Sequence, residues 1–213
     1  PAPTLDDVVV TGYRVPTLAR EAADSVTIVT REEIARQDPA SGVDLFRQIP
    51  GLQIDQPGAP GGLSSVYIRG SDPNHVLVLI DGVRVNDPTN SRGGGFDLSN
   101  LEPNNIERVE VLRGAASSVY GADAMGGVIN VVTRRSATGV PQGELGAGIG
   151  GHDFRSAHGR LSGGTPQASF SLSASKRRDG RDEDGGELDL RVFSGSARFA
   201  LGPAGSIDVD LRH

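Results

Sequence analysis

The sequence predicts an α+β domain followed by a series of antiparallel β-strands, and three observations lead to this fold class. Residues up to about 137 mix capped helical segments, short apolar strands and turns. From residue 138 onward, apolar and small polar residues alternate, which is the two-residue period of a strand with two different faces. In addition, 30 of the 213 residues are glycine, roughly twice the ordinary frequency and without a triplet period, which indicates a turn-rich folded chain.

Composition excludes several classes of protein. The chain has no cysteine, so disulfides and thiolate metal sites are impossible. The net charge is -6 and the only basic run is Lys176–Arg178, so a nucleic-acid partner is not expected. No apolar run reaches the roughly 18 residues of a transmembrane helix. The chain begins Pro-Ala-Pro-Thr without an initiator Met, which predicts a processed or trimmed N-terminus.

The first helices and strands follow a loose leader, residues 1–20. Residues 26–29 are apolar and predict a strand, and Thr30 with Glu33 forms a capping-box pattern that begins a helix. Asp38-Pro39 ends this helix. A second helix is predicted from a Ser41 cap through Ile49, where Pro50-Gly51 stops it.

Further strands are predicted across the rest of the α+β domain, residues 21–137. Residues 65–68 and 76–80 are strand-like, and the second run is continuous enough to be buried on both faces. Asp81-Gly82 predicts a hairpin turn into residues 83–85. Residues 106–112 alternate apolar and charged residues, so we expect Glu107 and Glu110 on a solvated face.

A glycine-rich stretch precedes the last strand of this domain. Tyr120 to Asp123 predicts a turn, Gly126-Gly127 a close approach between backbones, and residues 128–132 a core strand. The alternative is a phosphate-binding loop, but the glycine spacing matches neither the P-loop nor the dinucleotide motif.

Residues 138–213 predict five alternating segments, four of which stand out as 143–149, 168–175, 188–201 and 207–212. Short Gly/Pro turns and one longer polar loop separate them, and residues 192–193 interrupt the alternation once. This pattern is typical of the first antiparallel strands of a transmembrane β-barrel. A soluble antiparallel sheet with one wet face produces the same alternation, so both interpretations stay open.

Five motifs, in this order and spacing, carry a resemblance to a known family: QIPGLQI (48–54), SVYIRG (65–70), VLVLIDGVRVN (76–86), IERVEVLRG (106–114) and SVYGADAMGGVINVVT (118–133). They resemble the plug domain of TonB-dependent outer-membrane receptors. Within that family, the sequences of these motifs are similar to those of the vitamin B12 (cobalamin) receptors. The resemblance implies a plug filling a β-barrel in the bacterial outer membrane. It also implies active uptake of cobalamin, with a ferric siderophore or haem as the alternative cargo.

The resemblance also implies roles for individual residues. The stretch Asp6, Asp7, Val8, Val9, Val10 and Thr11 occupies the place of the energy-coupling box, which pairs with periplasmic TonB by strand addition. Pairing of this segment inside the domain is the alternative, and both can hold in turn. Arg69 and Arg113 correspond to plug arginines that latch onto carboxylates of the barrel wall.

Two polar Gly/Pro-rich loops, 55–65 and 86–97, match the apical plug loops that contact the ligand. The implied ligand contacts are Gln56, Leu63, Ser64, Asn90, Ser91 and Arg92. The second loop departs from the cobalamin pattern through Pro88, Arg92 and three glycines, which keeps the siderophore and haem alternatives open.

The aspartates Asp179, Asp182, Asp184 and Asp189 form a possible Ca²⁺ site in a polar loop, with a merely solvated loop as the alternative. No other cofactor is expected. The four histidines show no metal-binding spacing and there is no nucleophile elbow, so we do not expect an enzyme.

The predicted barrel is incomplete, because plugged transporter barrels have about 22 strands and this sequence contains five. We therefore expect either a piece of a longer receptor in contact with outer-membrane lipid, or a truncated plug module that binds a partner without transport.

Overall fold

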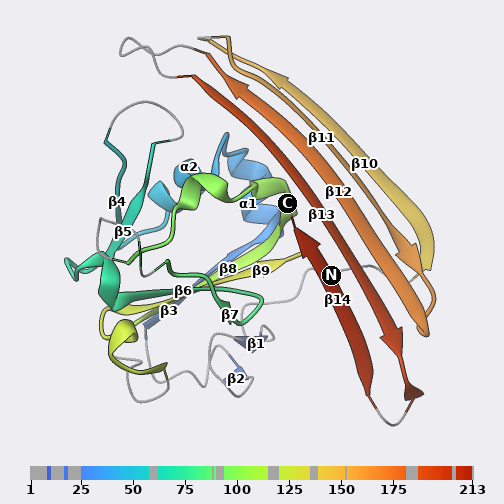
Figure 1. Cartoon of the computed structure of the whole chain (residues 1–213), viewed down its shortest axis with the longest axis horizontal. Helices are drawn as coiled ribbons and strands as arrows, with labels where there is room; N and C mark the ends of the chain where they lie inside the picture. Colours follow the sequence, from blue (N-terminus) through green and yellow to red (C-terminus); the bar gives the residue numbers. More distant parts are fainter. Residues whose placement is uncertain are drawn as a thin grey trace. The chain divides into compact units, whose positions relative to one another are not determined.

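The computed structural model describes residues 9–10, 17–18, 25–57, 62–87, 89, 94–114, 120–134, 139–151, 153–180, 187–202 and 205–212. The chain divides into two compact units, the first made of residues 1–57 and 63–133 and the second of residues 58–62 and 134–213. The first is a mixed α+β unit and the second is an open antiparallel sheet (Figure 1).

The first unit contains nine described strands, two α-helices and four 3₁₀ turns. The strands are β1 Val9–Val10, β2 Thr17–Leu18, β3 Ser25–Thr30, β4 Leu52–Asp55, β5 Ser65–Ile68, β6 Val76–Ile80, β7 Val83–Arg84, β8 Ile106–Arg113 and β9 Gly127–Thr133. The helices are α1 Arg31–Gln37 and α2 Gly42–Arg47, and the 3₁₀ turns are Pro73–His75, Leu98–Asn100, Pro103–Asn105 and Ala122–Ala124.

The central sheet of this unit has the strand order β3-β8-β9-β6-β7. Strands β6 and β9 are parallel, and the other neighbours are antiparallel. One hydrophobic cluster includes Ile34, Leu45 and Phe46 of the helices, and a second contains Leu77 and Leu112. Strand β6 is buried on both faces, as its unbroken apolar run predicts.

Both helices begin where the sequence predicts. Thr30 Oγ1 accepts a hydrogen bond from the Glu33 N–H at 3.4 Å, and Glu33 Oε2 accepts one from the Thr30 N–H at 2.9 Å, so the capping box is confirmed. The left-handed Asp38 ends α1. Helix α2 ends at Arg47, two residues earlier than predicted, because the chain tightens there and the Ile49 N–H bonds to the Phe46 carbonyl at 3.1 Å.

Gly126, just before β9, and Gly127, the first residue of β9, both lie against other chain segments, and Gly127 makes the predicted close approach to another backbone. A Cβ on Gly126 would lie 2.7 Å from Ser71 Cβ. Gly127 has φ +152°, and a Cβ there would lie 2.5 Å from the Leu112 carbonyl oxygen and 2.9 Å from Ile68 Cδ1. Glycine is therefore required where β9 enters the sheet between β8 and β6.

The prediction of a solvated face on β8 is wrong for Glu110. Glu107 is exposed, but Glu110 is fully buried because β8 is an inner strand with both faces covered. Its carboxylate accepts from Arg108 Nε at 2.9 Å and from Asn130 Nδ2 at 3.0 Å. The Asn130 Oδ1 in turn accepts from the Gly82 N–H at 3.3 Å, so this network ties the β6–β7 turn to the sheet.

The second unit is a sheet of five strands, each paired with its sequence neighbour (Figure 1). The strands are β10 Gly139–Ile149, β11 Arg155–Gly164, β12 Ala168–Asp179, β13 Leu188–Ala200 and β14 Ser206–Arg212. Among the described residues of this unit there are five strands, the number that the sequence pattern suggests. The interruption at residues 192–193 does not break β13, whose pairing with β12 is continuous from residue 188 to residue 199.

The two faces of this sheet have opposite character. Cross-strand partners share a face, and the register Leu161–Leu172–Gly195–Leu211 places these residues together. This apolar face carries Leu145, Leu161, Phe170, Leu172, Phe193, Phe199, Ile207, Val209 and Leu211. Leu145 is 90% exposed and Phe193 66% exposed. The other face, here the serine face, carries Ser162, Ser169, Ser171, Ser173, Ser194 and Ser196, of which the first three are buried.

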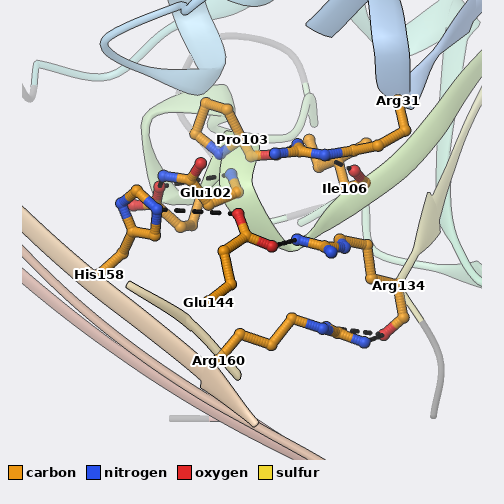
Figure 2. A network of polar contacts seen from close by, with 9 residues as sticks. Arg31, Glu102, Pro103, Ile106, Arg134, Glu144, His158 and Arg160 are labelled. Atoms are coloured by element: carbon orange, nitrogen blue, oxygen red, sulfur yellow. Dashed lines mark hydrogen bonds and ion pairs between the residues drawn. The ribbon is translucent and has the colours of Figure 1, made fainter. Parts of the chain in front are cut away.

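Ionisable side chains also lie on the serine face. Glu144 accepts from Arg134 Nη1 at 2.8 Å and lies 4.0 Å from His158 Nε2, and the Arg160 guanidinium donates to the Arg134 carbonyl (Figure 2). In the first unit, Arg31 donates to the carbonyls of Pro103 and Ile106, which fastens the start of α1 to the start of β8. None of the helices that the structure describes is long and apolar enough to cross a membrane.

Candidate functional site: a pocket under the plug loops

A pocket of about 450 Å³ lies in the first unit at the base of the two loops that the sequence singled out. Leu63 comes from the first loop, and the stretch from Val85 to Asn100 supplies the rest of the lining. Among the described residues, the lining consists of Leu63, Val85, Asp87, Thr89, Gly95, Phe96, Asp97 and Asn100. It combines an apolar patch with carboxylate, hydroxyl and amide groups.

Asn86 fixes the two ends of the second loop. Its Oδ1 accepts from the Val78 N–H at 2.7 Å, and its Nδ2 donates to the carbonyls of Val76 at 2.9 Å and Gly94 at 3.2 Å. The Asp87 N–H also donates to the Gly95 carbonyl at 3.2 Å. Both ends of the loop are therefore fixed to each other and to β6, which gives the pocket a rigid base.

Asp97 joins the second loop to the first. Its Oδ1 accepts from the backbone N–H of Ser64 at 3.1 Å and from Ser64 Oγ at 2.8 Å. The same carboxylate accepts from the backbone and side chain of Ser99. Ser64 Oγ accepts in turn from the Leu98 N–H at 2.7 Å. These hydrogen bonds run from one loop to the other and therefore hold the two loops together.

Asp87 and Thr89 form the polar rim of the pocket. Asp87 Oδ1 accepts from Thr89 Oγ1 at 2.6 Å and from the Thr89 N–H at 2.8 Å. The Thr89 side-chain hydrogen bond, followed by its backbone hydrogen bond, lowers the pKa of Asp87 below its usual value. The rim thus carries a fixed negative charge in an exposed position.

The predicted ligand contacts divide into three groups. Leu63 lines the pocket and is 47% exposed. Ser64 is fully buried, and its hydroxyl donates to Asp97 and so joins the two loops; its role as a ligand contact stays a prediction. Gln56 is half-buried and does not line the pocket, and Asn90, Ser91 and Arg92 lie outside the described residues. Sequence reasoning missed Asp87 and Phe96, although both lie in the loop that it selected.

The two predicted latch arginines differ in environment. Arg69 is exposed and has φ +51°, whereas Arg113 is buried. Arg113 donates to Thr27 Oγ1 at 2.6 Å and to the Pro50 carbonyl. Burial, and secondly the charge of Arg69, lower the pKa of Arg113. Within the part of the first unit that is described, Arg113 has neutral partners, and its pairing with a barrel carboxylate stays a prediction.

Of the predicted coupling segment, only Val9 and Val10 lie among the described residues. Their backbones form β1, which pairs antiparallel with Thr17 and Leu18 of β2. This is the pairing inside the domain that the sequence left open. The other four residues of the segment, Asp6, Asp7, Val8 and Thr11, lie outside the described residues.

The predicted calcium loop is described only at its two ends. Asp179 ends β12, and Asp189 lies near Lys176 at 3.9 Å and Arg191 at 3.4 Å. Asp182 and Asp184 lie outside the described residues. Across the described ranges, no three His, Asp or Glu side chains gather closely enough to hold a metal ion.

Comparison with known proteins identifies the family. Residues 19–128, more than half of the chain, match the family model of the TonB-dependent receptor plug domain. The siderophore receptor PirA from Pseudomonas aeruginosa has 28% identity over 89% of this chain and 33% of its own, with a TM-score of 0.68.

Two further solved structures share the fold. The pyoverdine outer membrane receptor FpvA from Pseudomonas aeruginosa PAO1 has 23% identity over 95% of this chain and 29% of its own, with a TM-score of 0.83. The ferric yersiniabactin uptake receptor FyuA from Yersinia pestis has 24% identity over 85% of this chain and 30% of its own, with a TM-score of 0.68. The chain spans about a third of the length of these structures. Its mixed sheet and its antiparallel strands match the plug and barrel of such receptors, and the chain belongs to the TonB-dependent receptor plug domain family.

Proposed function

We propose that this chain supplies the plug and the first barrel strands of an outer-membrane receptor that takes up a ferric siderophore with energy from TonB. The observation that carries the proposal is the pocket at the base of the two tied plug loops. The 28% identity to a structure described as a siderophore receptor favours a siderophore over cobalamin.

The pocket suits a compact metal chelate. Its volume of about 450 Å³ lies within the roughly 300–1,000 Å³ of typical ligand sites. The half-buried Phe96 and Val85 offer an apolar contact, and Thr89 and Asn100 offer exposed polar groups beside it. The negative charge of Asp87 favours a ligand that presents a hydrogen-bond donor or a cationic group at this rim.

The polarity of the second unit supports insertion into a membrane. A soluble sheet buries its apolar face and leaves its polar face wet. Here the leucines of the apolar face are exposed, as are Phe193 and Phe199. On the opposite face Ser162, Ser169 and Ser171 are buried. This arrangement is the one expected of barrel strands whose outer side contacts lipid.

The leader supports coupling by strand exchange. Strand β1 has only two residues, paired with the two residues of β2. So short a pair is marginal by itself, and a partner strand from TonB can replace it by adding to the same backbone groups. Binding at the pocket and pulling at the leader would then be two steps of one transport cycle.

The test is ligand binding to outer membranes that contain the native gene product, followed by uptake into cells. We expect saturable binding of a ferric siderophore, weakened at least tenfold in Phe96→Ala and Asp87→Asn. The matched control is Asp123→Asn, an exposed carboxylate that pairs with Arg84 and does not line the pocket. Val10→Pro should leave binding intact and abolish uptake, because proline cannot donate to an added strand.

Several outcomes would contradict this function. Saturable binding of cyanocobalamin or haem, with no competition from ferric siderophores, would show that the cargo is cobalamin or haem and not a siderophore. Binding without uptake in the unmodified protein would favour a plug module that does not transport. Repeating the titration with a calcium chelator tests the predicted site at the loop between β12 and β13.

A further inference from the structure

The pocket under the plug loops is negatively charged. Among the described residues that line it, the ionisable side chains are the carboxylates of Asp87 and Asp97, and no lysine, arginine or histidine is among them. Asp97 accepts its hydrogen bonds from Ser64 and Ser99, which are neutral donors. The bonds that hold the two loops together therefore leave this charge uncompensated within the described part of the pocket.

Thr89 orients the second carboxylate, that of Asp87. Both hydrogen bonds from Thr89, at 2.6 Å from its Oγ1 and at 2.8 Å from its N–H, end on Asp87 Oδ1. No other donor among the described residues reaches this carboxylate, so Oδ2 keeps its lone pairs for a donor from a ligand. The side chain is exposed and lines the pocket, and the same two bonds lower its pKa, so it is charged at neutral pH.

The lining beside these carboxylates is apolar. Phe96 and Val85 are half-buried, and Leu63 is 47% exposed. Methylene chains of a ligand gain affinity on such a surface, by about fourfold for each group removed from water. Asn100 is exposed and adds a neutral amide donor to the lining.

This combination discriminates between classes of ferric chelate by their charge. Three hydroxamates balance the charge of Fe³⁺, so a tris-hydroxamate chelate is neutral, and its linkers are methylene chains. Three catecholates carry twice as much negative charge, so a tris-catecholate chelate is a trianion. Specificity is strongest where one element attracts the right ligand and repels the wrong one, and a rim carboxylate attracts a cationic chelate and repels a trianion.

We propose that the pocket selects ferric tris-hydroxamates that carry a free ammonium group, and that Asp87 is the residue that sets this specificity. The ammonium donates to Asp87 Oδ2, the methylene linkers lie on Phe96 and Val85, and the Asn100 amide donates to a hydroxamate oxygen. The inference rests on the proposed function, because it names the class of siderophore that the same pocket takes.

Two chelates that differ in one charge test this specificity. Ferrioxamine B is a linear tris-hydroxamate with a free ammonium group, and its N-acetyl derivative has the same hydroxamates without that charge. Both are loaded with radioactive iron, and ferric enterobactin serves as the tris-catecholate. Binding is measured on outer membranes that contain the native gene product, Asp87→Asn or Asp123→Asn. The last variant is the matched control, since Asp123 is an exposed carboxylate outside the lining.

The bound chelate covers the rim, so its ammonium and Asp87 are screened less than two charges in open water. We therefore expect a contribution of about tenfold in affinity from this pair. The unmodified protein and Asp123→Asn should bind ferrioxamine B about tenfold more tightly than the N-acetyl derivative, and should bind the tris-catecholate more weakly than either. Asp87→Asn should abolish the preference by weakening the binding of ferrioxamine B alone.

Equal affinity for ferrioxamine B and its N-acetyl derivative, or a preference that persists in Asp87→Asn, would overturn this inference. Tighter binding of the tris-catecholate would also overturn it, while leaving siderophore uptake intact. Loss of that tighter binding in Arg92→Gln would then assign the specificity to Arg92, which lies in the same loop but outside the described residues.

The proposed function itself has a separate outcome. Absence of saturable binding by every ferric chelate, ferric citrate included, would refute siderophore uptake and not only the choice among siderophores. Heat-dependent mobility on gels verifies that each variant is folded.

Discussion

Replacing Gly127 by alanine tests the close approach at the start of β9. Two costs add at this position. The φ of +152° lies in a region that is essentially restricted to glycine, which costs about 1–3 kcal/mol. The new Cβ would also lie 2.5 Å from the Leu112 carbonyl oxygen, and overpacking of this kind costs about 1–3 kcal/mol. That oxygen belongs to β8, which pairs with β9, so the backbone cannot yield without disturbing the sheet.

The matched control is Gly70→Ala. Gly70 also has a positive φ, +78°, but a Cβ there would meet nothing within 4 Å. Only the backbone term of about 1–2 kcal/mol remains. The difference between the two variants, about 1–3 kcal/mol, therefore isolates the steric cost of the approach.

Hydrogen exchange of the β8 and β9 amides, measured by mass spectrometry on the purified protein, reports this difference. A gap of about 1–3 kcal/mol corresponds to about 5- to 150-fold faster exchange in Gly127→Ala than in Gly70→Ala. Equal exchange in both variants, or exchange in Gly127→Ala unchanged from the unmodified protein, would refute the steric argument.

Three further predictions concern single contacts. Glu110→Gln should lower the local stability of β8 by about 2 kcal/mol because charged hydrogen bonds are lost. Glu107→Gln, at an exposed position, should have no effect. Hydrogen exchange distinguishes the two variants, and equal effects would contradict the buried network. Thr89→Val should raise the pKa of Asp87 toward its usual value, and Thr89→Ser should not, in a carbon-13 carboxyl titration. The pKa of Asp87 is lower in the folded than in the unfolded protein, so the contribution of Asp87 to folding stability is present above about pH 4 and is lost as the pH falls through the folded pKa. An unchanged pKa of Asp87 in Thr89→Val would disprove the assigned cause. Thr30→Ala should lower the stability of α1 by about 1 kcal/mol, and Thr30→Ser should lower it much less. Amide hydrogen exchange in the first turn of α1 measures the loss, and equal exchange in Thr30→Ala and the unmodified protein would show that the cap does not stabilise the helix.

Local patterns were sufficient to predict most of the elements. The capping box at Thr30, the turn at Asp81 and the alternation after residue 138 each depend on neighbours within a few residues, and all three are found in the structure. Strand β4 was missed because Leu52 and Ile54 give only two apolar positions. Their pairing with β5 lies across a loop of nine residues, from Gln56 to Ser64.

The details of the site depend on contacts that the sequence does not display. Ser64 meets Asp97 across 33 positions, and nothing in either segment alone indicates that the hydroxyl is consumed by this bond. Glu110 has the same alternating context as Glu107, and only the central place of β8 in the sheet decides that one is buried. Sequence patterns therefore predicted the loops of the pocket, while the side chains that line it became visible only through tertiary contacts.

The strand orders of the two units imply different folding kinetics. In the second unit every strand pairs with the next one along the chain, so each hairpin can close over a short loop. In the first unit Arg113 bonds Thr27 across 86 positions, and β3 has no partner in the sheet until β8 has been synthesised. Closing so long a loop costs more entropy, and folding slows as contact order rises. The antiparallel sheet is therefore expected to assemble quickly from local hairpins, and the mixed sheet to be the slow step.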